Sequence, residues 1–98
     1  MGKINWTQES ERWLRDIHDY IALDSPKAAA STIQGIFDKV QFLEIHPRMG
    51  HHYMDVTDRE IRILLYGHYR IGYLVKGDGA IDILGVFHGS LDINRYLY

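Results

Sequence analysis

The stretch that decides the fold is Arg59–Asp92, REIRILLYGHYRIGYLVKGDGAIDILGVFHGSLD. It holds three runs rich in β-branched and aromatic residues, which favour strands. Two short glycine-containing segments, Gly67-His68 and Gly77-Asp78-Gly79, separate the runs and are typical of hairpin turns. The stretch therefore predicts a three-stranded antiparallel meander with strands over residues 60–66, 69–76 and 80–88.

Two helices are predicted before the meander. A capping residue, Thr7, precedes a helix over residues 8–23, whose apolar positions recur at helical spacing: Trp13, Leu14, Ile17, Tyr20 and Ile21. Ser25-Pro26 starts a second helix, and Pro47 ends it near Ile45. Because so few residues separate the helices, they should form an antiparallel hairpin.

The remaining segments are less regular. Lys3–Trp6 alternates polar and apolar residues, which predicts a short first strand. We expect residues 46–58 to form a loop or a ragged edge strand with a turn at Thr57-Asp58. We expect residues 90–98 to form a short helix or an extended segment on the sheet. The order β-α-α-β-β-β predicts one α+β domain over residues 1–98, with the helical hairpin on one face of an antiparallel sheet.

Composition excludes several classes of protein. The chain has 98 residues, 46% of them hydrophobic, and no cysteine, so neither a disulfide framework nor a thiolate metal site is expected. No apolar run is long enough to span a bilayer and no signal peptide is present, which predicts a cytoplasmic protein. The net charge of −2 disfavours a broad nucleic-acid surface. No cofactor is expected, and no metal either, because His51-His52 has no matching carboxylate or third histidine at a recognised spacing.

Four polar residues stand out on the predicted sheet: Arg62, Arg70, Asp82 and His88. Strand alternation places Arg70 and His88 on the face away from the helices. A three-residue turn at 77–79 would put Arg70 opposite Val86, with His88 diagonal to it at about 7–8 Å. An arginine can bind a phosphate and a histidine can exchange a proton, so the pair could form a site. The alternative is an ordinary solvated sheet face.

Arg62 has two possible faces. Alternation with the apolar residues Ile61, Ile63 and Leu65 places Arg62 on the Arg70 face. A two-residue turn at Gly67-His68 instead pairs Arg62 with Tyr73 and places it on the helix side.

The chain resembles the RelE/ParE superfamily, the toxins of type II toxin–antitoxin (plasmid stabilisation) systems. The resemblance covers residues 4–96 and rests on the helical hairpin and four segments: HPRMG at 46–50, EIRIL around Arg62, YRIGYLV at 69–75 and IDILGVFHGSLD at 81–92. It implies a small growth-arresting toxin neutralised by a cognate antitoxin, whose C-terminal segment wraps the hairpin and the sheet.

The two branches of the superfamily imply different chemistry. RelE-like toxins are ribosome-dependent mRNA endonucleases, and in that reading the catalytic residues are Arg62, Arg70 and His88. The His88–Asp92 ending and the lack of a basic residue directly after His88 resemble the ParE branch, whose members inhibit DNA gyrase and are not nucleases. ParE-like is the preferred interpretation; a degenerate, non-toxic antitoxin-binding module is a third. The residues expected to contact the target or the antitoxin are Arg62, Arg70, Tyr73, His88, Asp92 and Tyr96.

Overall fold

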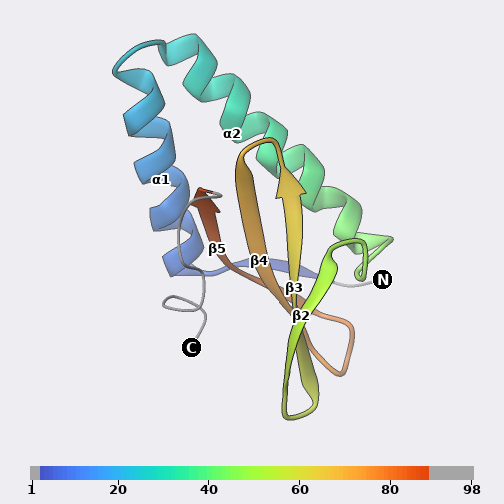
Figure 1. The fold of residues 1–98 in the computed structure, drawn as a ribbon. Coiled ribbons are helices and arrows are strands. Elements are labelled where there is room, and N and C mark those ends of the chain that lie inside the picture. The colour runs from blue at the N-terminus through green and yellow to red at the C-terminus, as the bar shows by residue number, and fades with distance from the viewer. Residues whose placement is uncertain (1–2, 89–98) are drawn as a thin grey trace.

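The computed structural model describes residues 3–88. The strand β1 (Ile4–Trp6) is followed by the helices α1 (Gln8–Ala22) and α2 (Pro26–Gln41), then by a 3₁₀ turn, η1 (Phe42–Glu44). Four strands complete the described chain: β2 (His51–Val56), β3 (Arg59–Tyr66), β4 (Tyr69–Val75) and β5 (Ile81–His88). The five strands form one sheet, and Figure 1 shows the helical hairpin beside it.

The α+β fold is confirmed, and the sheet differs from the predicted one in two respects. The strand order is β1-β5-β4-β3-β2, and β1 pairs with β5 in parallel, so the sheet is mixed rather than purely antiparallel. The segment between the helices and the meander forms a true edge strand, β2, antiparallel to β3. The expectations for residues 90–98 lie outside the described residues.

Both helix starts follow from their capping side chains. The Thr7 hydroxyl accepts a hydrogen bond from the Ser10 amide (3.1 Å) and donates one to the Ile83 carbonyl (2.6 Å), which ties the start of α1 to β5. The Ser25 hydroxyl accepts from the Ala28 amide (3.1 Å) at the start of α2. Caps of this kind satisfy backbone donors that the first turn leaves free.

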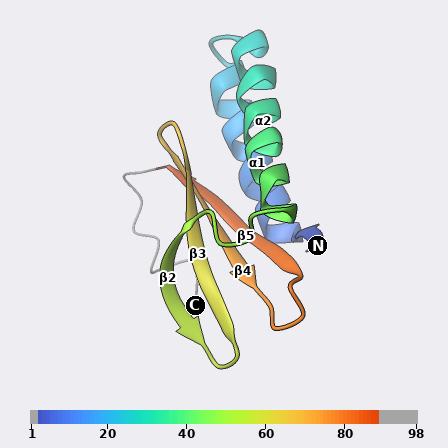
Figure 2. The same ribbon diagram turned by 90° about the vertical axis from the view of Figure 1, so that its right-hand side faces the viewer.

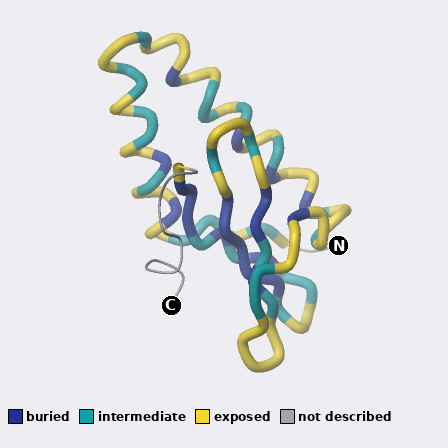
Figure 3. Tube along the Cα trace, in the orientation of Figure 1, coloured by how far each residue is buried: buried dark blue, intermediate teal, exposed yellow. Residues whose placement is uncertain are grey.

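The two helices lie against one face of the sheet, as the edge-on view shows (Figure 2). The core between the layers joins the inner stripes of the helices to one face of β3, β4 and β5; its fully buried members include Ile36, Val40, Leu43, Ile71, Tyr73 and Ile83. A second, smaller cluster on the other face contains Ile63 and Phe87, with Trp13 and Tyr53 packed against it. The tip of the helical hairpin and the β2–β3 turn are exposed (Figure 3).

Candidate functional site

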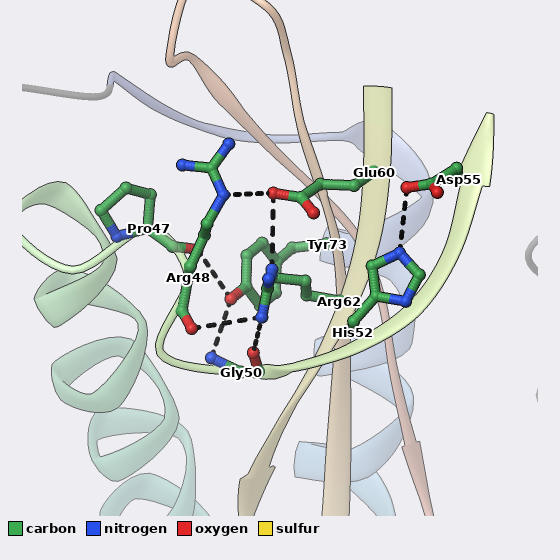
Figure 4. Close-up of polar contacts among 8 residues, drawn as sticks. All are labelled: Pro47, Arg48, Gly50, His52, Asp55, Glu60, Arg62 and Tyr73. Carbon is green, nitrogen blue, oxygen red and sulfur yellow. Dashed lines mark hydrogen bonds and ion pairs between the residues drawn. The ribbon is translucent and has the colours of Figure 1, made fainter. Parts of the chain in front are cut away.

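A network of polar contacts forms where the loop before β2 meets the sheet (Figure 4). Tyr73 on β4 has no exposed surface, and its hydroxyl reaches the HPRMG segment. That hydroxyl accepts a hydrogen bond from the Gly50 amide (2.9 Å) and donates one to the Pro47 carbonyl (2.8 Å). Burial raises the pKa of the Tyr73 hydroxyl above its ordinary value, although the Gly50 hydrogen bond and the nearby Arg62 act in the opposite direction.

Arg62 binds the same loop from the neighbouring strand. Its Nη1 donates to the Gly50 carbonyl (2.5 Å) and to the Arg48 carbonyl (3.3 Å). Its Nε lies 3.5 Å from Glu60 Oε1, which also meets Arg48 Nε at 2.6 Å. The Arg62 side chain is 16% exposed, and its guanidinium binds the loop carbonyls and lies beside Glu60.

The two-residue turn at Gly67-His68 determines the face of Arg62. Tyr66 pairs with Tyr69 across this turn, so Arg62 pairs with Tyr73 on the helix side of the sheet. Strand alternation predicted the other face for Arg62, on the assumption that Ile61 and Ile63 face the helices. Those residues are buried on the face away from the helices, where Ile63 joins Phe87. Both faces of β3 are therefore partly apolar.

Arg70 and His88 do not share a face, and the predicted pairing of Arg70 with Val86 is wrong. Arg70 pairs with Phe87 and Leu65, and its side chain is exposed. The register of β5 shifts by one residue because Gly72 pairs with Gly85 while Tyr73 pairs with Ile83, so Leu84 is the extra residue of a β-bulge. A one-residue shift exchanges the two faces of everything that follows it.

His88 consequently lies on the helix side of the sheet. It pairs with Tyr69 and contacts that ring edge-on, with the centroids 6.0 Å apart. Together with Val86 and several side chains of α1 it lines a surface pocket, whose α1 members are Trp13, Asp16, Ile17 and Tyr20. His88 is thus placed beside α1, across the sheet from Arg70.

Of the three remaining predicted residues, the structure describes Asp82 alone. Asp82 meets Lys76 Nζ at 3.1 Å and accepts a hydrogen bond from Asn5 (3.3 Å), which is the behaviour of an ordinary polar sheet face. Asp92 and Tyr96 lie outside the described residues.

The sequence did not indicate Glu60 or Arg48, which complete the network around Arg62. Their proximity depends on the path of the HPRMG loop, for which no sequence pattern was available.

The fold described above is shared with known toxins. A family model described as "ParE toxin of type II toxin-antitoxin system, parDE" matches residues 4–93. The chain therefore belongs to the ParE toxin family, within the RelE/ParE superfamily to which the sequence was likened. Among the curated proteins, none matches the chain significantly.

Two solved structures are similar to the chain. One is titled "Chromosomal ParDE TA system from P. aeruginosa"; it is 25% identical with a TM-score of 0.72, over 90% of this chain and 96% of that one. The other is titled "Crystal structure of archaeal RelE-RelB complex from Pyrococcus horikoshii OT3", at 18% identity and a TM-score of 0.68, over 93% of this chain and 98% of that one. The second likeness is one of fold alone. Within residues 3–88, no helix is both long and apolar enough to cross a membrane.

Proposed function

We propose that this ParE-family chain is the toxin of a toxin–antitoxin pair, that it arrests growth by inhibiting DNA gyrase, and that a cognate antitoxin neutralises it in the cytoplasm. The family match and the similarity to a ParDE system support this proposal over a ribonuclease. The antitoxin partner is inferred from the two similar structures, whose titles describe toxin–antitoxin assemblies.

The separation of Arg70 from His88 is the main observation that favours gyrase over RNA as the target. Cleavage of RNA by general acid–base catalysis needs a proton donor or acceptor and a positive charge directed at the same phosphate. Arg70 pairs with Phe87 on one face of the sheet, whereas His88 faces α1 on the other. The third candidate, Arg62, is engaged by loop carbonyls and Glu60. This arrangement does not direct the three candidate residues at one phosphate.

Exposed apolar side chains support a protein partner. Large apolar residues are exposed at the hairpin tip and at the end of α2, including Leu23 (86%), Tyr20 (77%), Ile45 (67%) and Phe42 (56%). Contiguous exposed apolar surface often marks a binding surface, and each end of the hairpin carries two of these residues. We propose that the C-terminal segment of the antitoxin covers part of the helical hairpin and the adjoining sheet.

The test compares two activities of the purified full chain. Gyrase is assayed for supercoiling of relaxed plasmid and for accumulation of cleaved DNA, and programmed ribosomes are assayed for mRNA cleavage. We expect loss of supercoiling, intact mRNA, and full relief when the antitoxin is added. His88→Ala and Arg70→Ala are assayed in parallel, because a nuclease would lose activity in both.

Two results would contradict the proposal. Ribosome-dependent mRNA cleavage that disappears in His88→Ala would favour the RelE-like alternative. Normal growth after induction of the chain without its antitoxin would favour a non-toxic binding module.

A further inference from the structure

The β2–β3 hairpin brings together three side chains of the types that bind metal ions. His52 and Asp55 come from β2, and Glu60, which pairs directly with Asp55, comes from β3. In a regular strand, residues 52 and 55 would point to opposite faces. The register of β2 shifts between His52 and Met54, which adds one residue and returns His52 and Asp55 to the same face. The bulge therefore creates the cluster.

The geometry of the cluster suits a small cation. His52 Nε2 lies 2.9 Å from Asp55 Oδ1, and one ligand atom from each of His52, Asp55 and Glu60 lies within 4.8 Å of the others (Figure 4). Donor atoms around a zinc ion at its usual bond lengths are about 3–3.5 Å apart. His52 and Asp55 are both exposed, so small rotations of their side chains would bring the three ligand atoms to the spacing found around zinc.

Glu60 is already held in place by its neighbours. Its Oε1 is buried and meets both Arg48 and Arg62, which leaves its second carboxylate oxygen for another partner. Contacts of this kind orient the side chains that bind a metal. The two guanidiniums also oppose a cation, so the affinity must depend mainly on the imidazole of His52 and on Asp55.

We propose that His52, Asp55 and Glu60 form a binding site for a divalent transition-metal ion of the Zn²⁺ class, with water completing its coordination. One imidazole and two carboxylates favour such ions over Mg²⁺, which prefers an all-oxygen environment. The ion links the edge strand β2 to β3 at the exposed end of the hairpin. An ion that binds only the folded chain also raises its stability by mass action.

The test measures binding of ZnCl₂ to the purified full chain by titration calorimetry, with His51→Ala as the matched control. His51 is equally exposed but pairs with Ile63, so its side chain lies on the opposite face of β2 from the cluster. We expect one ion per chain in the wild type and in His51→Ala. His52→Ala and Asp55→Asn should each weaken binding at least about tenfold, as the loss of one ligand predicts.

Asp55→Asn distinguishes loss of the site from loss of the fold, because the Asp55 side chain pairs with His52 and not with the Arg48–Glu60–Arg62 network. ZnCl₂ should raise the unfolding temperature of the wild type and of His51→Ala but not of Asp55→Asn. Equal binding by His51→Ala and His52→Ala would overturn the proposal, as would the lack of saturable binding by the wild type. Displacement of zinc by equimolar MgCl₂ would also overturn it, because the imidazole would then play no part.

Discussion

At the scale of single residues, Tyr73 shows how a side chain from the middle of the sheet holds a distant loop. Its hydroxyl makes two hydrogen bonds to the backbone of residues 47–50 from a fully buried position. Gly50 has room for nothing larger, because a Cβ there would lie 2.7 Å from the Ile63 carbonyl oxygen and 2.8 Å from the Tyr73 ring. The position of the loop therefore depends on a pair of residues that are far apart in the sequence.

Replacing Tyr73 with Phe should lower the free energy of unfolding by about 1–3 kcal/mol, because the Gly50 amide loses its partner in a buried position. Urea unfolding at neutral pH measures the difference. Tyr69→Phe is the matched control, since Tyr69 is only partly buried, and it should change stability less. Equal effects in the two variants would show that the Tyr73 hydroxyl does not hold the loop.

Tyr73 should also make the protein less stable in alkaline solution. Because its pKa is raised in the folded state, its contribution is fully present below the ordinary tyrosine pKa of about 10. Above that pH the unfolded chain loses the proton first, so stability falls until the folded pKa is passed. The difference in unfolding free energy between wild type and Tyr73→Phe, measured from pH 8 to about 11, should shrink as the pH rises. A constant difference would contradict this.

Replacing Arg62 should lower the free energy of unfolding more than replacing Arg70. Arg62→Leu removes the donor to two loop carbonyls and one of the two guanidiniums that Glu60 meets, and should cost about 1–3 kcal/mol of unfolding free energy. Arg70→Ala removes an exposed side chain and should change stability by no more than about 0.5 kcal/mol. Thermal and urea unfolding of both variants checks this. If Arg70→Ala loses toxicity without losing stability, Arg70 contacts the target.

At the scale of elements, β5 is shaped by its bulge and by the glycine that follows it. Gly85 pairs with Gly72, and the Phe87 ring lies over Gly85. Phe87 is 1% exposed and meets Trp13 nearly edge-on, with the centroids 4.9 Å apart. The bulge at Leu84 thus turns Phe87 toward the small apolar cluster with Ile63 and turns His88 toward α1.

Gly85→Ala should destabilise the protein by about 1–3 kcal/mol, because a Cβ at this position would lie 2.5 Å from the Phe87 ring, which is too enclosed to move freely. Gly77→Ala is the matched control in the β4–β5 turn, where the nearest atom lies 3.9 Å from the added Cβ and the backbone needs no positive φ. Denaturant midpoints measure both variants. If Gly77→Ala costs as much as Gly85→Ala, the close approach of Phe87 does not explain the effect.

At the scale of the whole molecule, the helical hairpin extends beyond the sheet (Figure 1). Large apolar side chains are exposed at both ends of the hairpin. If the antitoxin covers the end of α2, Phe42→Ser should weaken its affinity at least about tenfold, since buried aromatic anchors dominate most interfaces. Gln41→Ser, exposed and adjacent, serves as the control. Calorimetry with the purified antitoxin measures both. Unchanged affinity in Phe42→Ser would place the antitoxin elsewhere on the toxin.

Local sequence signals determined most of the architecture. Capping residues and apolar periodicity predicted both helices, and the two glycine-containing turns predicted the three strands of the meander, because these signals act between residues close in the chain. The helical hairpin and four segments, taken in their order along the chain, carried the family resemblance that the family model confirmed.

Only the tertiary structure decided which polar side chains meet. Alternation fails at Leu84 and at the His52–Met54 shift, because one extra residue in a strand exchanges its faces and no local signal marks the place. The first bulge separates His88 from Arg70, and the second brings His52 to Asp55 and Glu60. The position of Arg62 followed from the length of one turn, and its partners followed from a loop that Tyr73 holds across the sheet.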